Sequence, residues 1–404
     1  MLTEEHIARA ETIRIAEPED PFVNVCIDML GVVQTAHFMT GRETLTPDFW
    51  RSQDASDMRY KISDEELHKL HHGLLDRISR WSARGSRLTT EQEFKMAESL
   101  SSWLCIPEDD DWPDQLSDLG ERKPYGLWGR GKREYLSLLR SDRSIAVVGS
   151  RDISAYGTSA TSHITGDLAQ QGFSIISGGA FGIDAVAHRT ALAVVGSSRP
   201  PTVALMACGV DRPYPKHHES LLREIIDRGL LLSEVSLGSS PTRWRFLQRN
   251  RLIAALSSYT LVVEARWRSG ALNTAHHALS IGRELGVIPG QIFSPNSEGC
   301  HRLLKKELAH LVTDAQDIID TLTHRFSSVE PTLEIPVPEN AQKIEDLSEL
   351  QRRVWDSLPL RRPTSLEHIA TMSGLTERST MLILSQLASE GVATSWEGLW
   401  AKAE

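Results

Sequence analysis

The chain has 404 residues, of which 40% are hydrophobic and 24% are charged, as in soluble globular proteins with two or three domains. No apolar run approaches the ~20 residues of a membrane helix, and the first residues show no secretory signal, so we expect a cytoplasmic protein without membrane contact. The cysteines lack the paired spacing of a zinc site or a disulfide framework, and we expect neither a metal nor a cofactor. They are Cys26, Cys105, Cys208 and Cys300.

The charge is unevenly distributed along the chain, whose formal net charge is −10. Residues 1–120 contain 12 Lys and Arg against 24 Asp and Glu, residues 121–310 contain 24 against 15, and residues 311–404 contain 8 against 15. A basic middle therefore lies between two acidic ends, and it indicates a polyanionic partner. The alternative is a chance segregation of charges on solvated faces.

The first hundred residues predict a small helical domain of the SAM or helix-hairpin-helix kind. Leu2, Ile7, Ala8 and Ile13 have the spacing of an amphipathic helix, and residues 64–80 show the same pattern. We place this N-terminal domain at residues 1–100.

The central region predicts an α/β sheet. An acidic loop at residues 108–111 and a strap at residues 112–131 lead into it, and apolar β-type runs then alternate with helical stretches. This alternation is typical of a doubly wound, mostly parallel sheet, which we assign to residues 101–322. The expected strands are 144–149, 173–177, 202–207, 230–234, 259–265 and 286–289. The expected helices are 157–171, 181–194, 217–228, 245–256 and 271–284.

The C-terminal residues predict a separate winged-helix domain. Residues 323–345 are expected to be a linker, because three prolines interrupt them and no periodicity survives. Residues 346–404 show three helical patterns, with N-caps expected at Ser365 and Thr376, and then a short β-wing from residue 393. Three helices and a wing are the elements of a winged helix.

Glycine-rich segments follow two of the expected strands. Gly149, Ser150 and Arg151 come directly after the first strand, and residues 177–184 (SGGAFGID) follow the second. Because carboxyl ends of parallel strands meet at one edge, we expect both segments to converge. Exposed backbone N–H groups there favour phosphate, although a glycine after a strand is also a common turn residue. The candidate binding residues of the second segment are Ser177, Gly178, Gly179 and Gly182.

The same region lacks the fingerprints of common nucleotide enzymes. The segment SGGAFGID is not a GxGxxG dinucleotide motif, and no P-loop motif occurs in the chain. Asp184 and His188, one helical turn apart, permit acid–base chemistry, but we expect them to cap and brace the helix. Glu264 at the end of a buried strand is expected to brace an arginine. We therefore predict no catalytic residue.

An arginine run gives the strongest local indication of a polyanion. Arg243, Arg245, Arg249 and Arg251 lie close together, with no carboxylate from residue 241 to 263. On a helix Arg245 and Arg249 share a face, and such a like-charge pair is destabilising unless an anion is present. Further candidates are Asn250 within the run, Lys216 beside the possible stacking ring of Tyr214, and Ser269 and Gly270 at a helix start.

These motifs together resemble the DNA-processing protein A (DprA/Smf) family. The family's Rossmann-like core carries GSR, SGGAxGID, GxDxxYP, SE, RNRxIAxLS, VVEA, SGxLxTA, GR and PG. This chain has corresponding segments in that order from Gly149 to Gly290. The acidic helical N-terminal region and the terminal winged helix also fit the family's layout.

The resemblance implies an extended Rossmann-like fold and a sequence-independent single-stranded DNA-binding protein that is not an enzyme. Such proteins protect incoming DNA in natural transformation and help to load the RecA recombinase, usually as homodimers. Residues 300–308 depart from the family pattern, and this segment bears on dimer contacts. Carried over by motif, the phosphate pocket would be lined by Ser150, Arg151, Gly178, Gly179, Lys216, Arg249 and Arg251.

Two alternatives stay open. A nucleotide phosphoribohydrolase of the cytokinin-activating (LOG) type has a related fold, but its PGGxGTxxE loop contains a Thr and a Glu that SGGAFGID lacks. A double-stranded DNA regulator would use the winged helix. Its expected recognition helix, residues 376–390, has Arg378 as its one basic residue against Glu377 and Glu390, which is poor for reading a major groove.

Overall fold

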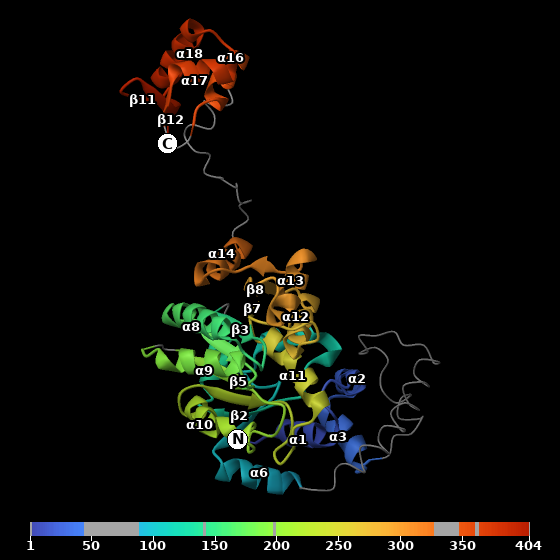
Figure 1. The fold of residues 1–404 in the computed structure, drawn as a ribbon. Coiled ribbons are helices and arrows are strands. Elements are labelled where there is room, and N and C mark those ends of the chain that lie inside the picture. The colour runs from blue at the N-terminus through green and yellow to red at the C-terminus, as the bar shows by residue number, and fades with distance from the viewer. Residues whose placement is uncertain are drawn as a thin grey trace, which may run out of the picture. The chain divides into compact units, whose positions relative to one another are not determined.

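The computed structural model describes residues 2–43, 89–139, 143–196, 199–326, 347–359 and 363–403. Its contacts divide the chain into two compact units, Met1–Ser327 and Ser328–Glu404, and Figure 1 shows the elements of each. The helix expected at residues 64–80 lies outside the described residues. In the described ranges, every helix is too short or too polar to cross a bilayer.

The first unit is built on a nine-stranded sheet with the order β1-β2-β6-β5-β4-β3-β7-β8-β9. All six strands expected from the sequence are present as β3 to β8. The strands are β1 (Ser102–Cys105), β2 (Leu127–Gly131), β3 (Ser144–Val148), β4 (Ser174–Ser177), β5 (Thr202–Leu205), β6 (Leu230–Ser233), β7 (Tyr259–Val262), β8 (Glu284–Val287) and β9 (His310–Leu311).

Helices precede the sheet and alternate with its parallel strands. The last of them, α14, continues through four residues that the sequence assigns to the linker, because no proline interrupts the chain before Pro331. The helices are α1 (Glu4–Ile15), α2 (Pro21–Leu30), α3 (Val32–Thr40), α6 (Thr90–Ser99), α7 (Tyr135–Leu138), α8 (Ala155–Gln170), α9 (Ile183–Ala193), α10 (Glu219–Arg228), α11 (Arg243–Ala255), α12 (Gly270–Ser280), α13 (Glu298–Lys305) and α14 (Ala315–Phe326), with short 3-10 turns η1 (Asp114–Arg122), η2 (Lys216–His218) and η3 (Pro295–Ser297).

The strap ends in a strand that the sequence did not predict. β2 pairs antiparallel with β6, with Trp128 opposite Ser233, and β1 pairs antiparallel with β2 at the edge of the sheet. The β2 sequence LWGRG holds two glycines, which weaken a strand. It forms a strand because the neighbouring β6 supplies the hydrogen-bonding partners.

Alternation along β3 sends side chains into two cores. Ile145 and Val147 pack with residues of α8, α9 and α14, whereas Ala146 and Val148 pack with residues of α11 and α12. Helices therefore cover both faces, as a parallel sheet requires. β4 lies on one side of β3 and β7 on the other. This reversal of strand order opens a crevice at the carboxyl ends of the strands.

The N-terminal helices share a hydrophobic core with the sheet domain. Ile13 of α1 belongs to the same cluster of buried residues as Ile225 of α10. Of the apolar stripe expected on α1, Ala8 and Ile13 are buried but Leu2 and Ile7 are exposed, because α3 and β1 cover α1 on another side. The domain boundary at residue 100 stays a prediction.

The second unit has winged-helix architecture. Ser365 caps α17 by accepting the His368 N–H, and Thr376 caps α18 by accepting the Ser379 N–H, so both expected N-caps are confirmed. The strand order is β10-β12-β11. The elements are α16 (Glu349–Asp356), β10 (Thr364–Ser365), α17 (Leu366–Ser373), α18 (Glu377–Ser389), β11 (Ala393–Trp396) and β12 (Leu399–Lys402).

A buried carboxyl group between α6 and the sheet makes the stability of the first unit depend on pH. Glu93 is fully buried, and its carboxyl oxygen accepts the Leu237 N–H at 3.0 Å. Burial raises the pKa of Glu93 to about 7, above its ordinary value of 4.5. The neutral carboxyl therefore stabilises the fold fully below about pH 4.5, and this contribution is lost as the pH rises through about 7.

We expect Glu93→Gln to remove this loss, because the amide does not ionise. The free energy of unfolding of the variant, measured by denaturant titration, should rise relative to the wild type between about pH 4.5 and pH 7. Glu98→Gln, at an exposed position of the same helix, is the control. A difference between Glu93→Gln and the wild type that is constant over this range would contradict the assignment.

Candidate functional site

A cleft of about 760 Å³ opens at the carboxyl ends of the central strands. Its walls come from the loops after β3 and β4, from α11 and from the start of α12. The structure thus brings together segments that are more than a hundred residues apart in the sequence. The sequence-predicted residues that line the cleft are Gly149, Ser150, Arg151, Arg243, Arg249, Asn250, Ser269 and Gly270.

The β3 exit contributes an exposed guanidinium. Arg151 lies over the ring of Phe246 at 5.2 Å from its centroid, and among the described residues no carboxylate lies within 4 Å of it. The Ser150 hydroxyl is already used locally, because it donates to the Asp152 carbonyl at 3.0 Å and accepts the Asp152 N–H at 3.2 Å. Arg151 is therefore the side chain of this segment that is available to an anion.

Helix α11 supplies a second, buried guanidinium. Arg249 is 5% exposed, and its Nη1 donates to the carbonyl of Gly178 at 2.7 Å and to that of Leu205. Its Nε has no hydrogen-bond partner in the described structure. Burial lowers the pKa of Arg249 to about 10, so the side chain remains charged at neutral pH. Arg243 on the same helix is exposed at the cleft.

The N-terminus of α12 forms the wall next to α11. Ser269 caps the helix by accepting the Ala271 N–H at 3.2 Å, and Asn250 of α11 donates to Asn273 of α12 at 3.1 Å. A helix N-terminus favours an anion. The exposed Arg268 precedes it and has no carboxylate within 4 Å in the described part of the chain.

Sequence reasoning missed several residues of this wall. The signal was present in the segment RWRSG, which puts two arginines directly before the predicted helix start. One of them, Arg266, pairs with Asp152 and donates to Asn296. The cleft-lining residues that were not among the candidates include Arg266, Arg268, Phe246, Asn273 and Thr274, and the acidic Asp152 and Asp184.

The glycine segment after β4 does not present its backbone N–H groups to the cleft. The Asp184 carboxylate accepts the N–H of Gly178 at 3.1 Å and that of Ala180 at 3.3 Å. His188 accepts the Gly179 N–H at 3.3 Å, and burial lowers the pKa of this imidazole to about 3, so it remains a neutral acceptor. Asp184 and His188 therefore brace α9 against the glycine segment as expected, but the expectation that they cap the helix is wrong, because its N-cap Gly182 has no side-chain cap hydrogen bond. The prediction that these glycines offer free N–H groups is wrong.

Three further candidates lie outside the cleft lining for separate reasons. Ser177 is fully buried and donates to the Val147 carbonyl at 2.7 Å. Gly182 has φ +80°, and a Cβ at this position would lie 2.1 Å from the Ser150 carbonyl oxygen, so it permits close packing of α9 against the β3 loop. Lys216 is exposed in η2 but does not line the cleft. The neighbouring Tyr214 does line it.

Arg251, a predicted phosphate ligand, serves the fold. It is completely buried, and its guanidinium pairs with Glu234 of the segment after β6. Arg245, expected to lack a neutralising carboxylate, pairs with Glu17 of the N-terminal region at 3.2 Å. The like-charge argument for a bound polyanion is therefore wrong at Arg245, because a carboxylate far away in the sequence supplies the missing charge.

Glu264 also has a different partner from the expected one. Its carboxylate accepts the N–H and the hydroxyl of Ser154, at 3.1 and 2.5 Å. Ser154 is the N-cap of α8. Glu264 therefore fixes the start of α8 against the end of β7, and it does not brace an arginine.

The sequence of the chain is similar to a family of known proteins. The sequence matches the family model of the DNA recombination-mediator protein A over residues 103–323. The chain belongs to this family. It is 38% identical over 307 residues to the putative DNA processing protein DprA of Mycobacterium tuberculosis, covering 74% of this chain and 76% of that protein.

Other members of the DprA/Smf family agree with this assignment. Protein Smf of Escherichia coli is 39% identical over 236 residues, which are 56% of this chain and 60% of that protein. The crystal structure of DNA processing protein A from Streptococcus pneumoniae matches with a TM-score of 0.58 and 28% identity, over 79% of this chain and 98% of that chain. The family resemblance and the Rossmann-like fold class predicted from the sequence are confirmed.

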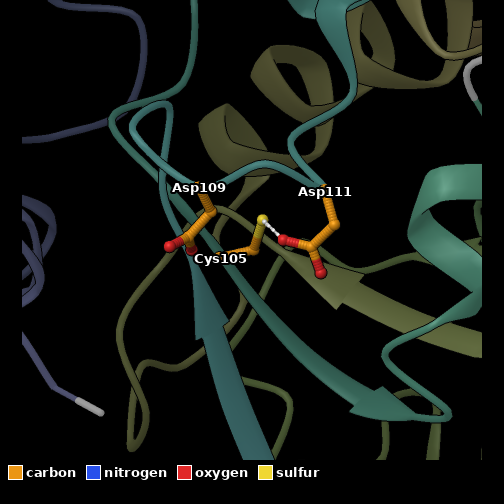
Figure 2. A group of neighbouring side chains, drawn as sticks. All are labelled: Cys105, Asp109 and Asp111. Atoms are coloured by element: carbon orange, nitrogen blue, oxygen red, sulfur yellow. Dashed lines mark hydrogen bonds between the residues drawn. The ribbon is translucent and has the colours of Figure 1, made fainter.

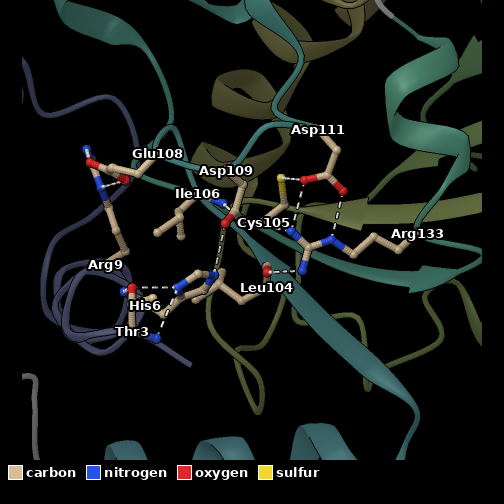
Figure 3. Close-up of polar contacts among 10 residues, drawn as sticks. All are labelled: Thr3, His6, Arg9, Leu104, Cys105, Ile106, Glu108, Asp109, Asp111 and Arg133. Carbon is tan, nitrogen blue, oxygen red and sulfur yellow. Dashed lines mark hydrogen bonds and ion pairs between the residues drawn. The ribbon is translucent and has the colours of Figure 1, made fainter. Parts of the chain in front are cut away.

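A second polar cluster, in the loop after β1, has the residue types of a metal site. Ligand atoms of Cys105, Asp109 and Asp111 lie within 4.8 Å of one another (Figure 2). Arg133, however, donates to both carboxylates at 2.8 Å, and Asp109 also pairs with His6 of α1 at 3.3 Å (Figure 3). Burial raises the pKa of the Cys105 thiol far above its ordinary value. The cluster ties α1 to this loop, and both carboxylates already have the Arg133 guanidinium as a cationic partner.

The buried pair of Arg251 and Glu234 predicts a stability defect. Glu234→Gln leaves the guanidinium with Glu19, 3.8 Å from its Nε, as its remaining carboxylate. We expect the free energy of unfolding to fall by about 3 kcal/mol, since a buried charge loses its partner. Thermal and denaturant unfolding would measure it. Glu224→Gln, which breaks an exposed pair on α10, should change stability by less than about 1 kcal/mol. Equal effects would show that the buried pair contributes nothing special.

Proposed function

We propose that this protein binds single-stranded DNA without sequence preference, in the cleft at the carboxyl ends of β3, β4 and β7. One observation carries the proposal: Arg151, Arg243 and Arg268 converge on one cleft without carboxylate partners among the described residues. Uncompensated guanidinium groups beside a helix N-terminus suit phosphate oxygens. Several relatives are named DNA processing proteins, which supports DNA as the source of the phosphates.

Aromatic rings favour a single strand over a duplex. The rings of Tyr214 and Phe246 lie 5.7 Å apart, and Tyr214 is 43% exposed. Unpaired bases stack on such rings, whereas the bases of a duplex are stacked on one another. Stacking does not depend on base identity, which fits binding without sequence preference.

The alternative function, a nucleotide phosphoribohydrolase of the LOG type, fits the glycine segment poorly. In the glycine segment, the Asp184 carboxylate already accepts two backbone N–H groups, and His188 accepts a third. No group of the cleft is assigned a catalytic role, and the protein acts as a binder. Incubation with AMP should release no free base.

The winged helix is a weaker candidate for the main DNA-binding element. The exposed face of α18 carries the apolar side chains Met381 and Leu382, with Arg378 as its one basic residue. A helix with so little positive charge is a poor partner for phosphates. Tight duplex binding by the separate unit of residues 347–403 would reverse this assignment.

The remaining parts of the proposal come from the family resemblance. The protein acts in the cytoplasm as a homodimer, protects incoming DNA and transfers it to the RecA recombinase. The exposed side chains of Leu308 and Leu311 near the sheet edge, 38% and 52% exposed, support a self-association surface there.

Arg151→Ala tests the cleft. We expect it to weaken binding to all oligonucleotide sequences alike, and to reduce the slope of log affinity against log salt by about 0.7, because one phosphate contact is lost. Fluorescence anisotropy with a dT oligonucleotide and with unrelated sequences measures both quantities.

Two controls accompany this test. Arg189→Ala removes an exposed arginine of α9 that does not line the cleft, and it should leave affinity unchanged. The same titration with a duplex should show weaker binding, and light scattering on the same sample should give the mass of a dimer. Unchanged affinity of Arg151→Ala would refute the assignment of the cleft.

A further inference from the structure

We propose that Trp267 is a stacking platform for a base of single-stranded DNA outside the cleft, and that Arg302 holds its ring in place. This platform extends the track of the strand past the start of α12 and rests on the proposed function. It assigns a base-binding role to a side chain that does not line the cleft.

Trp267 belongs to a segment that also lines the cleft. Trp267 lies between Arg266 and Arg268, both of which line the cleft, while its own side chain does not. All three belong to the short loop from β7 to α12. A strand whose phosphate contacts Arg268 therefore has its neighbouring nucleotide close to Trp267, because adjacent phosphates of an extended strand are spaced like two or three residues of polypeptide.

The side chain of Trp267 is exposed to solvent. Trp267 is 54% exposed, although tryptophan has the largest aromatic surface to bury. No hydrophobic cluster of the described residues includes it. Its ring therefore does not serve the packing of the first unit, and about half of its surface remains available to a ligand.

The ring of Trp267 is in contact with an arginine of α13. The Arg302 guanidinium lies 4.4 Å from the centroid of the Trp267 ring, within the range of a favourable cation–π interaction. Arg302 has no carboxylate within 4 Å among the described residues. The contact fixes the ring and adds a positive charge beside it. The exposed Lys305 and Lys306 lie three and four residues further along the chain.

A second contact between an arginine and an aromatic ring occurs inside the cleft. Arg151 lies over Phe246 at 5.2 Å, as Arg302 lies over Trp267. In each pair a guanidinium contacts a ring next to cleft arginines, and Phe246 also has Arg249 at 6.0 Å from its centroid. A ring with an adjacent free cation combines the two groups that a single strand needs, a surface for a base and a charge for a phosphate. An apolar protein partner would not use the charge.

Variants at Trp267 test this platform with dT oligonucleotides of graded length. We expect Trp267→Ala to lower the affinity for long oligonucleotides by about 5- to 150-fold, the equivalent of one stacked base. It should leave the shortest bound oligonucleotide unaffected. The salt slope should stay unchanged because indole carries no charge. Trp267→Phe, which keeps a ring, should recover most of the affinity.

The control is Trp396→Ala, which removes an exposed tryptophan of the second unit and should leave binding unchanged. Thermal unfolding of each variant checks that the fold is intact. A second readout uses a dT oligonucleotide of the shortest length that is sensitive to Trp267→Ala, with one abasic position moved along it, because a longer strand would slide and move the abasic position off the platform. The abasic strand should lose affinity at one position with wild type and lose none there with Trp267→Ala.

The outcomes separate this platform from the cleft. If Trp267→Ala binds long oligonucleotides like the wild type while Arg151→Ala binds them weakly, the platform is wrong and the proposed function stands. If the wild type binds no single-stranded DNA, both are wrong. If Trp267→Ala changes the mass measured by light scattering but not the affinity, Trp267 belongs to a protein contact and the platform is again wrong.

Discussion

The buried guanidinium of Arg249 joins the elements that form the cleft. It donates to main-chain carbonyls at the ends of β4 and β5 and so fixes α11 against the sheet. Gly178 leaves the space for it, because a Cβ there would lie 2.3 Å from the guanidinium. A buried charge is costly, and the charge of the buried Asp184 carboxylate acts against the lowering of the Arg249 pKa. Arg249 therefore stabilises the elements that line the cleft proposed to bind DNA.

Two of the remaining arginines of α11 form ion pairs with carboxylates from other parts of the chain, and the third does not. Glu17 from the N-terminal region pairs with Arg245, and Glu234 from the segment after β6 pairs with Arg251. Arg243 stays exposed at the cleft. The acidic N-terminal region therefore does more than add negative charge, because it neutralises the side of α11 that faces away from the cleft.

Several parts of this architecture were predictable from the sequence for local reasons. Apolar runs and helical periodicity gave the strands β3 to β8 and the helices between them, since these patterns reflect side chains that face the nearest core. Glycines after strands indicated the edge of the sheet where the cleft lies, and Ser365 and Thr376 indicated the starts of two helices. The motif order indicated the family, which the match over residues 103–323 confirms.

Only the tertiary structure decided which charged and polar groups are available to a ligand. Arg245 and Glu17 are 228 residues apart, and Arg249 and Gly178 are 71 apart, so no local pattern shows that these groups satisfy one another. The same holds for β2, whose glycine-containing sequence becomes a strand by pairing with β6. The sequence determines where strands end and how much charge lies nearby, because these are properties of consecutive residues. Whether each N–H and guanidinium is free is decided by distant partners, because a hydrogen bond or ion pair depends on distance in space.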